Sequence, residues 1–115
     1  MVVVLVTCPS RAVAARLARH LVSRRMAACA NIVPGLTSLF WWKSKVDRSR
    51  ETLLLLKTMA AGFEPLRRAV LALHPYDVPE IIALPVVAAH APYRTWVASS
   101  LRRNSRVFKT DRVKY

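Results

Sequence analysis

Glycine and acidic side chains are scarce in this sequence of 115 residues, which has two glycines, Gly35 and Gly62, and six Asp or Glu. Two isolated glycines cannot build a dinucleotide-binding fingerprint, a phosphate-binding P-loop or a nucleophile elbow. The glycine-containing aromatic strand of RNA-recognition modules is missing as well. No Ser/His/Asp or Cys/His arrangement is apparent in the sequence. We therefore expect a protein that is not an enzyme.

Cysteine and histidine are also few, and their spacing is not that of a zinc site. Cys8 and Cys29 form no CxxC pair, and His20, His74 and His90 lie far apart. Unbroken apolar runs are short: the longest, 81–89, falls well below the roughly 18 residues of a membrane span. The first residues, MVVVLV, carry no basic leader. We expect a soluble, cytoplasmic protein with free thiols and no membrane insertion.

Positive charge is what the sequence has in excess, with a formal net charge of +13. The stretch after Leu101 holds six Lys or Arg and one acid, a net charge of +5, which leaves +8 for the first 101 residues. Such a chain attracts polyanions, either through weak non-specific contacts or through a dedicated site. We favour the first alternative and expect no specific nucleic-acid partner.

The order of predicted elements is β-α-β-β-α-β followed by a terminal helix. β-branched and apolar runs predict strands at 2–7, 28–43, 51–58 and 79–89, with a kink at Pro34-Gly35 and a turn within 45–50. Apolar residues at helical spacing predict helices at 11–25, 60–74 and 91–103, the first capped by Ser10. This order is that of an α+β ferredoxin-like sandwich, with helices on one face of the sheet. We expect one domain at 1–103 and a basic tail at 104–115.

The second predicted strand is too long for a compact chain of this size. About 15 residues at ~3.3 Å each span roughly 50 Å, whereas a compact chain of this length is about 35 Å across. The adjacent Trp41 and Trp42 point to opposite faces of that strand, and only one face can carry the helices. Either the hairpin protrudes and is covered by another copy of the chain, or the kink folds it back over its own core. We favour the homo-oligomer.

The segment LHPYDVPEII, residues 73–82, holds the residues best suited to chemistry. Two prolines stop the preceding helix and fix the entry to the last strand, and Asp77 is suited to bonding local amides. His74 ends the helix, and a neutral imidazole is a common ligand of copper and zinc. One histidine makes a weak site, so we expect Cys8 or Glu80 to join it in binding copper or another divalent cation.

Lys57 ends a buried strand, where a lysine needs an anionic partner. That partner is either Glu51 or Glu80 in a structural ion pair, which we favour, or an anionic ligand. The candidate residues for a ligand pocket or interface are Trp41, Trp42, Glu51, Lys57, Tyr76, Tyr93 and Trp96.

Four segments, in order and spacing, resemble the CutA family of divalent-cation tolerance proteins. They are VVVLVTCPS, LVSRRMAACANIVPGLTSLFWW, LLLLKT and LHPYDVPEIIALPV, and the resemblance runs from about Val2 to Leu101. It implies a ferredoxin-like homotrimer similar in architecture to the PII signalling proteins. It also implies a role in copper and divalent-metal tolerance with no established catalytic reaction, and an animal relative is associated with anchoring acetylcholinesterase. The alternatives are a PII-like anion or nucleotide sensor and an interaction scaffold.

The sequence departs from the family pattern where metal binding is attributed. The resemblance places a cysteine late in the first strand and a histidine pair before Pro-Tyr; Val6 and Leu73-His74 stand there, so only His74 is retained. Cys8 lies two residues further along. An acid and a glycine often follow the tryptophan pair in relatives, whereas this chain has Lys43 and Ser44. We therefore expect copper binding weaker than in relatives with the full set.

Overall fold

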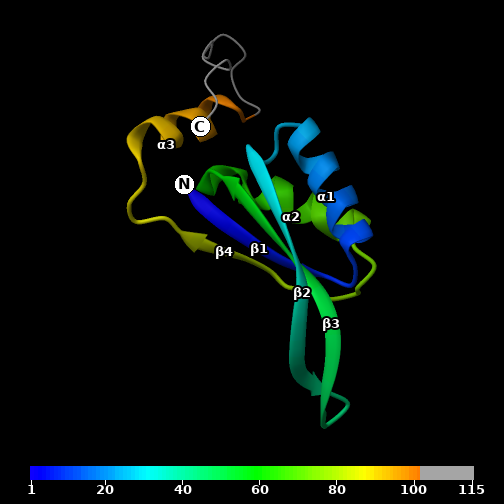
Figure 1. Ribbon diagram of the computed structural model, residues 1–115. Coiled ribbons are helices and arrows are strands. Elements are labelled where there is room, and N and C mark those ends of the chain that lie inside the picture. Colours follow the sequence, from blue (N-terminus) through cyan, green and yellow to red (C-terminus); the bar gives the residue numbers. More distant parts are fainter. Residues whose placement is uncertain (102–115) are drawn as a thin grey trace.

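The structure, a computed structural model, describes residues 1–101 as four strands and three α-helices. The strands are β1 (Val2–Cys8), β2 (Cys29–Trp42), β3 (Lys45–Thr58) and β4 (Ile81–Pro85). The helices are α1 (Arg11–Ser23), α2 (Phe63–Leu73), preceded by the 3₁₀ turn Ala60–Gly62, and α3 (Ala91–Ser99) (Figure 1). The predicted domain boundary at 103 and the basic tail 104–115 lie outside the described residues.

The four strands form one antiparallel sheet in the order β2-β3-β1-β4. Each β-α-β crossover therefore joins two strands that run in the same direction with another strand between them, as a ferredoxin-like sandwich requires. The predicted fold class and element order are confirmed. The final strand is shorter than predicted, because its pairing with β1 stops where Pro85 meets Val2. The final helix also ends earlier than predicted, at Ser99.

The core lies between one face of the sheet and the helices α1 and α2. Alternate residues of β1 and β3 are buried on that face, among them Val4, Val6, Leu54 and Leu56, all with no exposed surface. They pack against the apolar faces of α1 and α2, including Ala14, Leu17, Leu21, Leu66 and Val70. Because successive side chains of a strand point to opposite faces, this packing fixes which residues the sheet turns away from the helices.

α1 starts as predicted, with Ser10 Oγ accepting a hydrogen bond from the amide of Val13 at 3.2 Å. Arg16 then ties α1 to the end of α2, its guanidinium donating to the Leu73 carbonyl at 3.3 Å. This bond satisfies one of the carbonyls that the last turn of a helix leaves open. A second cluster joins α3 to the sheet through Ala28, Val97 and Leu101.

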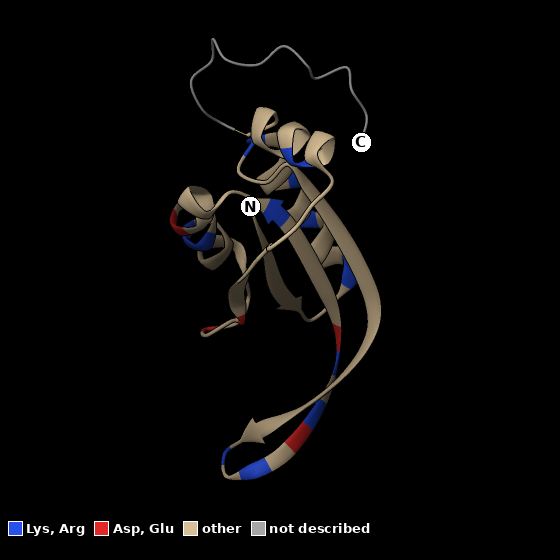
Figure 2. Cartoon of the chain, turned by 90° about the vertical axis from the view of Figure 1, so that its left-hand side faces the viewer, with Lys and Arg blue, Asp and Glu red and all other residues tan. Residues whose placement is uncertain are grey.

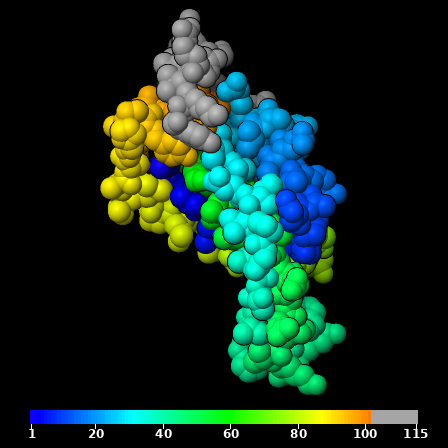
Figure 3. Space-filling view, viewed as in Figure 1, coloured from blue at the N-terminus to red at the C-terminus, as the bar shows by residue number. Residues whose placement is uncertain are grey.

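The hairpin of β2 and β3 extends far beyond the core, as predicted from its length. β1 pairs only with residues 52–58 of β3, so the outer halves of β2 and β3 form a two-stranded ribbon. We call residues 36–51 the ribbon. It stands clear of the body in Figure 3, and the described chain measures 51 × 27 × 22 Å. Trp41 and Trp42 are 75% and 58% exposed, so the alternative in which the strand folds back over the core is wrong.

The kink of β2 is a β-bulge at Pro34-Gly35. Pairing with β3 shifts between Val33 and Leu36, and Gly35 has a φ of +88°, which glycine adopts without strain. The proline and glycine in the sequence therefore marked this irregularity correctly.

The predicted turn at 45–50 is wrong, because these residues are the first part of β3. The strand starts at Lys45, and the connection is the two-residue turn Lys43-Ser44, with φ of 50° and 64°. Two positive φ values define a type I′ turn, whose backbone twist suits a hairpin but which favours Asn-Gly. Neither Lys43 nor Ser44 is a residue that this turn favours, so the sequence predicted the turn in the polar stretch that follows.

Replacing Lys43-Ser44 by Asn-Gly should stabilise the protein by about 1 kcal/mol, because residues that tolerate positive φ relieve the strain of the turn. For a domain of this size that raises the melting temperature by roughly 4 °C or more, measurable by circular dichroism. Gly35→Ala is the companion variant, which should lower the melting temperature. A new Cβ there meets no atom within 4 Å, so its loss of stability reports backbone strain alone. An unchanged or lower melting temperature for the Asn-Gly variant would refute the turn assignment.

Candidate functional site

Four of the predicted site residues meet where the ribbon leaves the sheet. Cys8 ends β1, Glu51 lies where β3 enters the sheet, and His74 and Tyr76 follow α2. The Tyr76 hydroxyl donates a 2.7 Å hydrogen bond to Glu51 Oε2, and the rings of Tyr76 and His74 lie 4.8 Å apart at 49°. We call these four residues the ribbon-base cluster. It links the segment after α2 to the strand that forms the ribbon.

His74 is held by both of its ring nitrogens. The Tyr76 amide donates to Nδ1 at 3.1 Å, and Nε2 lies 2.8 Å from the Thr7 carbonyl. Nδ1 therefore acts as the acceptor, so the proton of the neutral ring is on Nε2, which donates to Thr7. The side chain is buried, and this pair of bonds fastens the loop after α2 to the end of β1.

Burial governs the protonation of the Cys8 thiol and the Tyr76 hydroxyl, which lie beside Glu51. Loss of hydration raises the pKa of the Cys8 thiol to about 11, and the nearby Glu51 carboxylate adds to the effect. Burial, the hydrogen bond to Glu51 and the charges of Glu51 and Cys8 together raise the pKa of Tyr76 to about 12. Both groups are neutral at physiological pH, and Cys8 is an inert buried thiol rather than a reactive one.

The predicted metal set of His74, Cys8 and Glu80 is not assembled within residues 1–101, where no three His, Cys, Asp or Glu side chains are placed to hold an ion. His74 and Cys8 are buried, whereas Glu80 is exposed. Within this part of the chain, only Glu80 of the three presents a free ligand atom to solvent. The metal role of these residues stays a prediction.

Lys57 does not form the favoured ion pair, and the alternative of an anionic ligand stays a prediction. Its ammonium donates to Asn31 Oδ1 and lies 3.8 Å from Cys29 Sγ, both on the neighbouring strand β2. The ion pairs among residues 1–101 all involve Glu64, so the expected pairing of Lys57 with Glu51 or Glu80 is wrong. A neutral amide takes the place of the carboxylate.

Tyr93 and Trp96, predicted for a pocket or interface, belong to the packing of α3. Their rings stack at 5.7 Å and lie against the cluster of Ala28, Val97 and Leu101. A hollow of the surface, about 400 Å³, is lined by other residues, including Arg25, Met26, Met59 and Leu101.

The sheet face turned away from α1 and α2 is apolar and incompletely covered. Strand pairing places Val3 beside Leu84 and Leu5 between Leu55 and Ile82 on this side. Ile82 and Leu84 are 45% and 48% exposed, whereas Val4, Val6, Leu54 and Leu56 on the helix side have no exposed surface. We call this side, with residues Val3, Leu5, Leu53, Leu55, Ile82 and Leu84, the open face. The unbroken apolar run of β3 was its sequence signal.

Comparison with known proteins gives a consistent result. Residues 2–100 match the family model described as CutA1 divalent ion tolerance protein. The divalent-cation tolerance protein CutA of Thermus thermophilus is 50% identical over 95 residues, which cover 83% of this chain and 92% of that protein. Protein CutA 1, chloroplastic, of Oryza sativa is 43% identical over 103 residues, which cover 90% of this chain and 58% of that protein.

The fold agrees with that of a relative whose structure is solved. A structure of the divalent cation tolerance protein from Thermus thermophilus superimposes with a TM-score of 0.86 at 48% identity, covering 89% of this chain and all of that one. Among residues 1–101, no helix has the length and apolar character needed to span a membrane.

Tyr76→Phe should destabilise the protein by about 1 kcal/mol, because a half-buried carboxylate loses its hydrogen bond. The effect has a pH signature. The folded state keeps the Tyr76 proton to about pH 12, whereas an unfolded tyrosine loses it near pH 10, so the free energy of unfolding falls as pH rises between these values. Urea titrations at pH 8 and 11 should show a steeper alkaline loss for wild type than for Tyr76→Phe. Identical pH dependence in the two proteins would contradict the hydrogen bond.

The thiol of Cys8 should be unreactive in the native protein. Cys29→Ser leaves Cys8 as the single thiol, and its burial and raised pKa both oppose attack on a disulfide reagent at pH 8. We expect labelling only at the rate of unfolding, and complete labelling in denaturant. Rapid labelling of the folded variant would place Cys8 at the surface.

Proposed function

The chain belongs to the CutA1 divalent ion tolerance protein family, and we propose that it serves metal tolerance as a non-catalytic homotrimer. In this proposal a divalent cation, copper among them, or a small ligand binds where subunits meet. The family name supports the link to divalent cations. The number three follows from the family resemblance, and the need for a partner copy follows from the surfaces of the single chain.

The open face is the observation that carries the proposal. A sheet with one apolar face exposed to water is unfavourable, at roughly 25 cal/mol per Å² of apolar surface. The ribbon adds exposed Leu39, Trp41, Trp42 and Val46 to the same molecule. β2 and β4 are the two edges of the sheet, so among residues 1–101 each also has one side with no strand paired to it. A second copy of this chain offers matching apolar surface for all of these features.

Binding between subunits also agrees with the metal residues of the single chain. His74 and Cys8 are occupied or buried, and Glu80 projects from the exposed segment between Pro75 and β4. A lone carboxylate binds a cation weakly, because divalent ions need several ligands. Groups from a neighbouring copy would supply the remaining ligands.

A charge on the open face should dissociate the assembly. Ile82→Glu places a carboxylate where Ile82 is 45% exposed in the single chain, so the fold tolerates it while an apolar interface does not. Leu71→Glu on α2, at 40% exposure, is the matched control on the helix side. We expect sedimentation at micromolar concentration to show trimers for wild type and Leu71→Glu and monomers for Ile82→Glu. A monomeric wild type would refute the proposed assembly.

Copper binding should depend on Glu80. Calorimetric titration of the protein with copper alone is expected to show binding that weakens about tenfold or more in Glu80→Gln, because a carboxylate ligand is lost. Glu64→Gln removes an exposed carboxylate on the helix side and should leave binding unchanged. Cys8→Ser should also leave it unchanged. Equal affinity in all these variants would show that the ion binds elsewhere.

A further inference from the structure

We propose that the helical layer of this protein binds the phosphate backbone of double-stranded nucleic acid without reading its sequence. The surface consists of seven arginines on α1, on the two residues after α1, and on α2. We call it the arginine layer; its members are Arg11, Arg16, Arg19, Arg24, Arg25, Arg67 and Arg68. It lies across the sheet from the open face, so it is independent of the metal function proposed above.

The arginine layer holds most of the excess charge of the described chain. Residues 1–101 carry a net charge of +8, and the seven arginines with the single acid of these helices, Glu64, account for +6 of it. No acidic residue precedes Asp47 in the sequence, so α1 has no acid of its own. Figure 2 shows the acidic residues on the ribbon, on α2 and near the start of β4.

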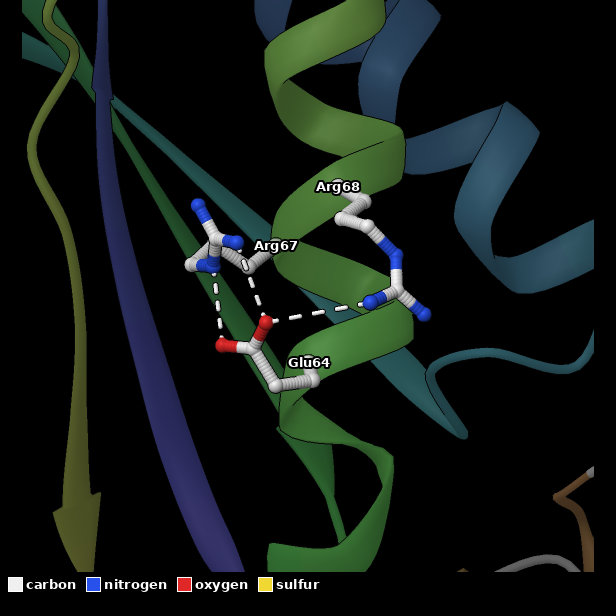
Figure 4. A network of polar contacts seen from close by, with 3 residues as sticks. All are labelled: Glu64, Arg67 and Arg68. Atoms are coloured by element: carbon white, nitrogen blue, oxygen red, sulfur yellow. Dashed lines mark hydrogen bonds and ion pairs between the residues drawn. The ribbon is translucent and has the colours of Figure 1, made fainter.

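The one acid of the layer is already neutralised. Glu64 Oε2 lies 2.9 Å from Arg67 Nε, and Oε1 lies 3.0 Å from Arg67 Nη2 and 3.9 Å from Arg68 Nη1 (Figure 4). Both pairs are partly exposed and are worth little to stability. Arg11, Arg19 and Arg24 are exposed and form no ion pair with any described residue. These three arginines therefore present guanidinium groups to solvent with no carboxylate to neutralise their charge.

The chemistry of the cations points to phosphate. All seven are arginine and none is lysine, and the planar guanidinium matches two phosphate oxygens at once. Two of them are oriented by the fold, since Arg16 donates to the Leu73 carbonyl and Arg25 to the Ser100 carbonyl at 3.1 Å. These bonds use part of each guanidinium and leave other N–H groups for an anion.

A duplex suits this surface better than a membrane does. Attachment of a helix to an anionic bilayer combines cations with apolar side chains that enter the interface. The large apolar residues exposed on α1 and α2 are only Val22 and Leu71, at 36% and 40%. Backbone neutralisation of a duplex needs cations alone, and it predicts affinity that falls steeply with salt.

The test compares two triple variants of the full chain that lose the same charge. Arg19→Gln, Arg24→Gln and Arg68→Gln are combined in the arginine layer, leaving Arg16 and Arg25 in place. Lys45→Gln, Arg48→Gln and Arg50→Gln are combined in the ribbon as the control of equal charge loss, and sedimentation first confirms that this variant keeps the wild-type assembly. Binding of each protein to a 20-base-pair DNA duplex, to an RNA duplex of the same length and to phosphatidylserine vesicles is measured from 50 to 200 mM salt. Circular dichroism melting confirms that both variants are folded.

We expect wild type to bind both duplexes, and the arginine-layer variant to bind about tenfold or more weakly at 100 mM salt. Its slope of log affinity against log salt should be shallower by about 2 to 3, at roughly 0.9 for each lost phosphate contact. The ribbon variant should remain within about threefold of wild type. Equal losses in the two variants, unchanged binding in both, or binding by wild type to vesicles but not to duplexes would each overturn the proposal.

Discussion

The two-sided burial of β1 and β3 is the constraint on which the rest of the structure depends. Their alternate residues are sealed against α1 and α2, and the sheet geometry then directs an equally apolar set of side chains to the other side. Strands that are apolar on both faces need cover on both faces. The helices supply one cover, and among the described residues the open face keeps apolar side chains partly exposed. The single chain therefore leaves one apolar face of its sheet only partly covered.

The ribbon-base cluster lies where β3 passes from the sheet into the ribbon. β3 runs from the buried sheet into the ribbon without a break, and Glu51 lies at the transition. The Tyr76 hydroxyl bonds Glu51, and the His74 ring bonds the Thr7 carbonyl at the end of β1. These two bonds hold the segment after α2 against the base of the ribbon. His74, predicted as a metal ligand, uses both ring nitrogens to hold this segment, and the metal role of His74, Cys8 and Glu80 stays a prediction.

The sequence predicted the fold well because its signals were local. Ser10, Pro34-Gly35 and the apolar runs mark a cap, a bulge and the strands, and the family resemblance agrees with them. The Lys43-Ser44 turn was missed because neither residue is typical of positive φ. The site was predicted only in part. Glu51, Tyr76, His74 and Cys8 do meet, but partners such as the Thr7 carbonyl and Asn31 depend on strand register, which single residues do not reveal.

The central claim, that another copy of the chain covers the ribbon and the open face, is tested most directly by hydrogen exchange in β2. This strand is an edge, so within one chain the amides on its outer side point to solvent and should exchange within seconds. Covering by a second copy predicts slow exchange across residues 36–42 at micromolar concentration and fast exchange on dilution. Fast exchange at every concentration would contradict it.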